Sequence, residues 1–199
     1  MERIAGYILA GGNNRRMQGR KKLFLPYDHQ TDFFHSIMRS MQKLPKVYLS
    51  VAKEEREYKK LGLPLVADRY VDAGPLGGIL SGLLSCEEEG LFVVPCDIPV
   101  IEEAFMDDML DIYDGRTPVI VKQDGRYYPM PGIYTKSQIP VMQEMMAQKD
   151  YKLMNVFPKD SEGKLFYAVA NTPGFQEVQS INTREEYERW RKGHETTER

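Results

Sequence analysis

Residues 7–25 read YILAGGNNRRMQGRKKLFL and join an apolar segment to a glycine turn and then to a basic cluster. The apolar run at 7–10 predicts a short buried strand, and Gly11-Gly12 ends it where the backbone can turn sharply. The cations that follow, with no acidic residue among them, are Arg15, Arg16, Arg20, Lys21 and Lys22. Backbone N–H groups at such a turn, together with nearby cations, suit a phosphate. This stretch therefore predicts an anion site.

Two other interpretations of this stretch stay open. A Gly-Gly turn after a first strand is common in α/β domains, and basic runs are often solvated surface. The spacing matches neither the Walker A motif nor GxGxxG. The phosphate hypothesis therefore depends on what the rest of the chain places beside the turn.

Length and composition predict one soluble globular domain. The chain has 199 residues, of which 42% are hydrophobic and 28% charged, which is enough to bury one core. We expect residues 1–193 to form a single domain and residues 194–199 to be a frayed tail. The net charge of −2 argues against general nucleic-acid binding, so the basic cluster should serve a small ligand.

The sequence also predicts a cellular compartment. No apolar run approaches the length of a membrane span, and the N-terminus lacks the apolar core of a signal peptide. We therefore expect a cytoplasmic protein without a membrane partner. Cys86 and Cys96 fit neither a disulfide framework nor a zinc site, since no CxxC or nearby His pair is present. Reduced, buried thiols are expected.

Strand-like and helix-like segments alternate along the first half of the chain. We predict strands at 7–10, 46–51, 63–67 and 91–96, and helices at 32–44, at 54–61 and from Gly74 onward. This order is typical of an α/β fold, and we expect a Rossmann-like three-layer α/β/α arrangement with a mostly parallel central sheet.

The second half is less regular and predicts a mixed edge of the sheet. Strands are expected at 117–122 and 130–134 around an exposed turn at 123–125, with another at 166–170 before a turn at 172–174. The Met-rich segment 140–148 indicates ordinary helix packing rather than a ligand pocket. Thr183 and Glu186 fit a capping box, which predicts a final helix with Tyr187 and Trp190 on its apolar side.

Two aspartates follow predicted strands directly. Asp68 comes after the strand at 63–67 and Asp97 after the strand at 91–96. Ligands of doubly wound sheets bind outside the carboxyl ends of the strands, so both aspartates should lie on the same rim as the Gly11-Gly12 turn. Asp97 is the best candidate ligand for Mg²⁺, with a helix N-cap as the alternative, and Asp68 could equally form a turn.

The chemistry that such a rim suggests is phosphate handling without a protein nucleophile. None of the three histidines stands in a pattern with Ser or Cys that indicates covalent catalysis. Cations and backbone donors would hold a nucleoside triphosphate while a carboxylate holds the metal ion. Displacement directed by a metal and by cations is the better hypothesis.

These motifs resemble one known family, the molybdenum cofactor guanylyltransferases (MobA family), whose fold is that of nucleotide-diphospho-sugar transferases. Leu9-Ala10-Gly11-Gly12, Arg16-Met17, Gly19 and Lys22-Leu23 are similar to its opening signature LAGG-x-x-x-RM-x-G-x-x-K. Later motifs follow in the same order: Gly74-Pro75-Leu76, Pro95-Cys96-Asp97-Ile98-Pro99 and Ile181-Asn182-Thr183.

The resemblance implies transfer of GMP from GTP to molybdopterin or Mo-molybdopterin, with release of pyrophosphate and with Mg²⁺ as cofactor. Arg16, Lys22 and Asp97 would be catalytic, with Asp97 as the metal ligand. The resemblance places Gly77, Gly78 and Asn182 on the acceptor side, and it implies transient contact with cofactor-biosynthesis or acceptor proteins. The nucleotide would be bound by Leu9, Ala10, Gly11, Gly12, Lys22, Ser50, Asp68 and Asp97.

The chain departs from the family pattern at three positions. Lys21 stands where the family usually has Asp, which would add a charge beside the phosphates, and Gln18 stands where Gly is usual. Ser50 replaces an Asn that often helps to read the base. A related nucleotidyltransferase using CTP or another NTP therefore stays open. So does a non-catalytic nucleotide-binding or adaptor protein, for which Lys21 and Gln18 are the reason.

Overall fold

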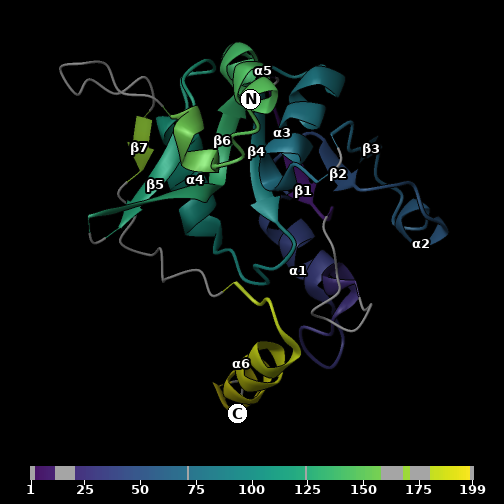
Figure 1. Ribbon diagram of the computed structural model, residues 1–199. Coiled ribbons are helices and arrows are strands. Elements are labelled where there is room, and N and C mark those ends of the chain that lie inside the picture. The colour runs from purple at the N-terminus through teal and green to yellow at the C-terminus, as the bar shows by residue number, and fades with distance from the viewer. Residues whose placement is uncertain are drawn as a thin grey trace.

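A single twisted sheet organises the chain (Figure 1), and the computed structural model describes residues 3–11, 21–70, 72–123, 125–157, 168–170 and 180–197. In the described residues the sheet has seven strands in the order β3-β2-β1-β4-β6-β5-β7. Their bounds are β1 Ile4–Leu9, β2 Val47–Val51, β3 Leu65–Ala67, β4 Gly90–Pro95, β5 Val119–Gln123, β6 Arg126–Thr135 and β7 Ala168–Ala170.

Most neighbouring strands are parallel, as expected. β1 pairs in parallel with β2 and β4, β2 with β3, and β5 with β7, whereas β6 is antiparallel to both β4 and β5. The hairpin of β5 and β6 pairs Gln123 with Arg126, which confirms the predicted turn and the mixed edge. β6 begins four residues before the predicted strand at 130–134. Its early residues are only partly buried, so their sequence pattern is weak.

Helices cover the two faces of the sheet and give the predicted three layers (Figure 1). Ile4 and Ile8 of β1 face a core shared with α1 and α4, while Tyr7 and Leu9 face a core shared with α3 and α5. This alternation follows from the two-residue period of a strand. The helices are α1 Phe33–Ser40, α2 Arg56–Lys59, α3 Gly74–Ser85, α4 Glu103–Ile112, α5 Ile139–Gln148 and α6 Arg184–Thr197, with short 3-10 helices η2 Lys22–Phe24, η3 Lys136–Gln138 and η4 Leu153–Val156.

Three helices differ from the prediction. α1 ends at Ser40 rather than at residue 44, and α2 is one turn rather than the whole of 54–61. The sequence pattern did not indicate α4, because its acidic residues obscure a narrow apolar face. That face consists of Phe105, Met106 and Met109, all buried in the core that α4 shares with α1 and one face of the sheet.

The core-packing interpretations are confirmed. Phe33, Phe34, Ile37 and Met41 are buried, and Met142 and Met145 pack in the core under α5. The segments predicted as a turn at 172–174 and as the start of the strand at 166 lie outside the described residues.

The final helix α6 lies beyond the end of the sheet and beside α1 rather than on a sheet face (Figure 1). It has the predicted capping box, in which the backbone N–H of Thr183 donates to Glu186 and the backbone N–H of Glu186 donates to Thr183 Oγ1. It continues past Gly193 to Thr197, into the segment for which we expected fraying. Tyr187 packs with Phe33 and Leu25 in a small separate core.

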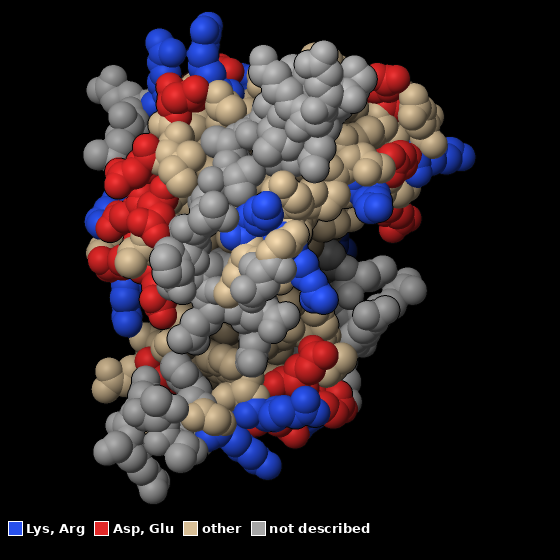
Figure 2. Space-filling model, turned by 90° about the vertical axis from the view of Figure 1, so that its left-hand side faces the viewer, with Lys and Arg blue, Asp and Glu red and all other residues tan. Residues whose placement is uncertain are grey.

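The surface and the cysteines bear on the expected chemistry. The face shown in Figure 2 carries acidic and basic side chains side by side rather than one broad basic area. Among the described residues no helix is both long and apolar enough to cross a membrane. Cys86 is buried and Cys96 is of intermediate exposure; both are free, and burial of the sulfur raises the pKa of each thiol to about 12. Both thiols are therefore uncharged at neutral pH.

Candidate active site

The carboxyl ends of three strands meet at one rim of the sheet. The backbone N–H of Ala10, after β1, donates to the Ser50 carbonyl of β2 at 3.0 Å. The backbone N–H of Cys96, after β4, donates to the Leu9 carbonyl at 3.0 Å. Because β1 lies between β2 and β4, the segments that leave the three strands run next to one another. The polar side chains of this rim form two clusters, one on each side of β1.

The first cluster, called the serine–aspartate cluster, consists of Leu9, Gly11, Ser50, Asp68 and Gly78. Ser50 is fully buried, and its hydroxyl donates to Asp68 Oδ1 at 2.9 Å. Burial raises the pKa of the Asp68 carboxyl group, and the hydrogen bond from Ser50 partly opposes that shift. Asp68 thus keeps a second oxygen, Oδ2, that faces Gly11.

Both glycines of this cluster leave space that neighbouring side chains fill. A Cβ atom on Gly11 would lie 2.6 Å from Asp68 Oδ2, and one on Gly78 would lie 2.8 Å from Leu9 Cδ2 and 3.3 Å from Ser50 Oγ. The first turn of α3 is held there because Tyr7 Oη donates to the Gly78 carbonyl at 2.8 Å.

The structure separates the three residues that the resemblance placed on the acceptor side. Gly78 faces the serine–aspartate cluster, and a Cβ on Gly77 would lie 2.8 Å from the Cβ of Ala73 and 3.1 Å from Tyr70. Asn182 lies in the other cluster. The spacing of motifs along the chain contained no signal for this division, because it depends on which side of β1 each segment packs.

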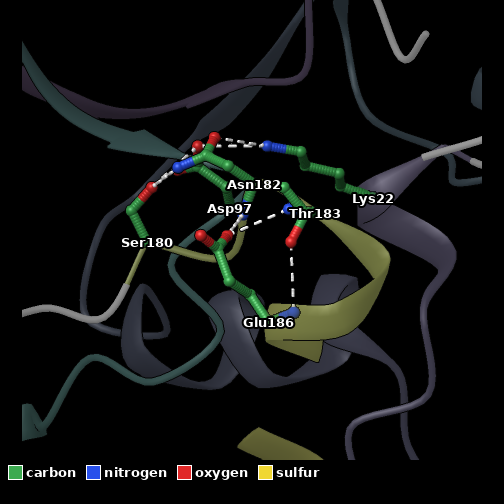
Figure 3. Close-up of polar contacts among 6 residues, drawn as sticks. All are labelled: Lys22, Asp97, Ser180, Asn182, Thr183 and Glu186. Carbon is green, nitrogen blue, oxygen red and sulfur yellow. Dashed lines mark hydrogen bonds and ion pairs between the residues drawn. The ribbon is translucent and has the colours of Figure 1, made fainter. Parts of the chain in front are cut away.

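The second cluster, called the lysine–aspartate cluster, consists of Lys22, Asp97, Ser180 and Asn182 (Figure 3). Lys22 Nζ lies 3.3 Å from Asp97 Oδ2 and donates to Asn182 Oδ1 at 2.9 Å. Ser180 Oγ donates to Asp97 Oδ2 at 3.3 Å, and Asn182 Nδ2 donates to Ser180 Oγ at 2.5 Å. Lys22 and Asp97 side chains are 14% and 22% exposed, so both still face solvent at the rim.

Backbone contacts fix this cluster from two directions. Asp97 lies two residues after the end of β4, and its carbonyl oxygen accepts from the Ile181 N–H at 2.8 Å. The backbone N–H of Asn182 donates to Glu186 Oε2 at 2.6 Å, so the first turn of α6 holds Asn182 (Figure 3). The hydrogen bonds from the backbone N–H groups of Asn182 and Thr183 hold the pKa of the Glu186 carboxyl group below its ordinary value. Asp97 is not a helix N-cap, since α4 begins at Glu103 with Glu102 in the cap position.

The donor atoms of the lysine–aspartate cluster fit a hard cation such as Mg²⁺. Asp97 supplies a carboxylate that accepts from the Ser180 hydroxyl, and the amide oxygen of Asn182 accepts from Lys22, which also contacts Asp97. Mg²⁺ in nucleotide sites is commonly held by one or two carboxylates plus phosphate oxygens and water. The described residues contain no group of three or more His, Cys, Asp or Glu that could hold a metal ion. These residues therefore do not supply a complete set of such metal ligands.

Several predicted residues are placed differently or lie outside the described structure. Gly12, Arg16 and Gln18 are outside the described residues. Lys21 does not add a free charge at the rim, contrary to expectation. Its ammonium group lies 2.6 Å from a carboxylate oxygen of each of two glutamates, Glu55 and Glu57, next to α2.

Comparison with known proteins assigns this geometry to a family. Residues 6–163 match the family model described as the MobA-like NTP transferase domain. The chain is 30% identical over 185 residues to a probable molybdenum cofactor guanylyltransferase of Clostridium perfringens strain 13, covering 91% of this chain and 92% of that one. It is 28% identical over 190 residues to the molybdenum cofactor guanylyltransferase of Serratia proteamaculans, covering 95% and 94%.

A solved structure shares the fold. Molybdopterin-guanine dinucleotide biosynthesis protein A from Archaeoglobus fulgidus superposes with a TM-score of 0.70 at 16% identity, covering 96% of this chain and 99% of that chain.

Proposed function

This chain belongs to the MobA-like NTP transferase family, and from that premise we propose that it transfers GMP from GTP to molybdopterin or Mo-molybdopterin with release of pyrophosphate. The family makes it a nucleotidyltransferase of molybdenum cofactor biosynthesis. Beyond this reaction class, the proposal specifies GTP as the donor, molybdopterin or Mo-molybdopterin as the acceptor and Mg²⁺ as the metal. The observation that carries them is the presence of two polar clusters at one rim, on opposite sides of β1.

The serine–aspartate cluster suits a nucleobase that offers hydrogen-bond donors. A carboxylate accepts only, and guanine presents an N–H and an amino group side by side on one edge. Asp68 Oδ2 faces Gly11, and a Cβ at that position would lie 2.6 Å from this oxygen and cover it. We propose that Asp68 accepts from guanine and that Ser50 orients the carboxylate, because the buried hydroxyl already donates to Asp68.

The lysine–aspartate cluster suits the phosphates. Lys22 neutralises charge on the triphosphate, and Asp97 holds Mg²⁺, which when bound polarises the phosphates and stabilises the departing pyrophosphate. A terminal phosphate oxygen of the acceptor attacks the α-phosphorus, and the bond between that phosphorus and the pyrophosphate oxygen breaks. No protein nucleophile is needed. Asn182 hydrogen-bonds to Lys22, and this contact supports the proposal that Asn182 faces the acceptor phosphate.

The structure weakens one argument for a non-catalytic adaptor. That argument used the extra charge of Lys21, which Glu55 and Glu57 neutralise. CTP stays an alternative substrate, because a carboxylate also accepts from the amino group of cytosine. Cytosine has a single amino donor on the corresponding edge, so Asp68 would accept one hydrogen bond fewer from cytosine than from guanine.

The test is calorimetric titration with each of the four NTPs, with and without Mg²⁺, followed by pyrophosphate release in the presence of molybdopterin. We expect magnesium-dependent preference for GTP and release only with acceptor. Preference for CTP would assign another nucleotide to the same mechanism. Binding without release would identify an adaptor, and no binding of any NTP would refute the proposal. The same assay with added cofactor-biosynthesis proteins tests whether the acceptor is handed over by a partner.

A further inference from the structure

Lys21 is the centre of an ion-pair cluster next to the rim but outside both polar clusters. Its ammonium group contacts Glu55 Oε2 and Glu57 Oε2, each at 2.6 Å. Only 15% of the Lys21 side chain is exposed. Burial lowers the pKa of Lys21, but hydrogen bonds to the two glutamates more than offset this and hold it above its ordinary value. The lysine is therefore charged, and its position is fixed.

The ring of Tyr58 forms the floor of this cluster. Lys21 Nζ lies 4.4 Å from the centroid of the ring, within the range of a cation–π contact. Tyr58 is itself buried, and its ring stacks on Phe24 with the centroids 5.8 Å apart. Phe24 is the last residue of η2. Lys21 and Phe24 thus attach both ends of η2 to the same short helix α2.

Lys22 lies between these two attachments and points in a different direction. Its ammonium group contacts Asp97 at 3.3 Å and Asn182 at 2.9 Å, whereas the side chain of Leu23 is buried in the core. Lys21 is the residue directly before η2, and Lys22 is the first residue of η2. Fixing Lys21 therefore restricts the backbone from which the Lys22 side chain leaves.

The segment between β2 and α2 also lies next to Gly11. A Cβ on Gly11 would lie 3.5 Å from the backbone nitrogen of Ala52, three residues before Glu55. Gly11 and Lys21 therefore both rest on the segment 52–57. This segment follows Ser50 in the chain, so it links the serine–aspartate cluster to Lys21, the residue before Lys22.

We propose that Lys21 is a positioning residue whose ion pairs with Glu55 and Glu57 fix η2 and direct the Lys22 ammonium group to the rim. The two carboxylates neutralise the charge of Lys21 and hold its ammonium group beside α2, so in this proposal Lys21 acts through Lys22 rather than on a phosphate. The nucleotide readout below rests on the proposed function, but the chemical-labelling readout does not.

The first experiment measures acetylation of Lys22 by limiting acetic anhydride, followed by peptide mass spectrometry. In Lys21→Met, we expect Lys22 to react several-fold faster than in the wild type, because it leaves Asp97 and Asn182 more often. Lys21→Arg keeps the ion pairs and should restore the slow rate. The matched control is Lys59→Met. Lys59 lies in α2, and its Nζ is 2.9 Å from Glu54 Oε2, so this variant also removes one ion-paired lysine. Unchanged reactivity of Lys22 in Lys21→Met would overturn the proposal.

The second experiment is a double-mutant cycle on the affinity for Mg-GTP, with Lys21→Met, Lys22→Ala and both together. We expect Lys21→Met to weaken binding about fivefold in the wild type and not at all in Lys22→Ala, because its effect passes through Lys22. A merely structural role would give additive losses, and additivity would overturn the proposal. If Lys21→Met does not fold, Glu55→Gln with Glu57→Gln removes the same pairs. Wild-type protein that binds no GTP would refute the proposed function, while the labelling still decides the role of Lys21.

Discussion

The Ile181 N–H donates to the Asp97 carbonyl oxygen at 2.8 Å and so joins the start of α6 to the end of β4. This single backbone contact brings the carboxylate of Asp97 beside Ser180 and Asn182, which are otherwise remote in the chain (Figure 3). It does not involve the Asp97 side chain. The carboxylate can therefore be removed while the backbone arrangement persists.

We expect Asp97→Ala to lower turnover by about a hundredfold or more, because in the proposed function Asp97 is the carboxylate ligand of the metal. The melting temperature should change little, since the contact with Ile181 uses the backbone. Steady-state pyrophosphate release and calorimetric melting test this. Asp108→Ala, which removes an exposed carboxylate of α4, is the control. Activity within a few-fold of the wild type in a stable Asp97→Ala protein would disprove the role as metal ligand.

Base selectivity should depend on the serine–aspartate cluster. In Asp68→Asn, one acceptor becomes a donor, so we expect KM for GTP to rise about tenfold or more while kcat changes less. In Ser50→Ala the carboxylate stays but loses its orienting hydrogen bond, and a smaller rise is expected. Kinetics with all four NTPs provide the measurement. A uniform loss with every NTP would contradict recognition of the base.

The pH dependence of stability should reveal the buried charge of Asp68. Its pKa is raised in the folded protein by burial, so the folded state binds protons more tightly than the unfolded state. The stability contributed by this group is therefore greatest below its ordinary pKa of 3.8 and is lost as pH rises through the raised value. Asp68→Asn should melt at a higher temperature than the wild type at pH 7, and this difference should shrink at acidic pH. An equal difference at both pH values would contradict the assignment.

Two glycine-to-alanine substitutions in helices should have opposite effects. Gly78→Ala brings a Cβ to 2.8 Å from Leu9 Cδ2, so we expect lower stability together with weaker GTP binding. Gly193→Ala lies in α6, and a Cβ there meets nothing within 4 Å. It should stabilise the protein by about 0.5–1 kcal/mol through helix propensity. Calorimetric melting of both variants checks this, and a neutral Gly78→Ala would show that α3 can shift away.

The docking of α6 should affect turnover through Asn182. The ring of Trp190 contacts Phe33 with the centroids 5.4 Å apart, and Tyr187 Oη donates to the Pro26 carbonyl at 2.9 Å. Trp190→Ala should loosen α6, speed its proteolysis and lower kcat about tenfold. Tyr187→Phe loses one hydrogen bond but keeps the ring, and it should change kcat little. Rapid proteolysis with unchanged kcat would separate α6 from catalysis.

The sequence alone was sufficient for the architecture and for one rim of polar groups. Apolar runs of strand length alternate with helical patterns, and that periodicity is a local property of the chain. Asp68 and Asp97 stand directly after strands, and parallel strands end at the same edge, so their shared rim followed from order alone. Local patterns failed at α4, where acidic residues interrupt the apolar face of Phe105, Met106 and Met109.

Only the tertiary structure decided which polar groups meet at that rim. Lys22 and Asn182 are 160 residues apart yet form a hydrogen bond. Lys21 and Lys22 are identical neighbours, but one pairs with Glu55 and the other with Asp97. The physical reason is that periodicity specifies which face of an element is buried, whereas the partner of a polar side chain depends on how distant segments pack. That packing is set by the whole core at once, so no single motif contains it.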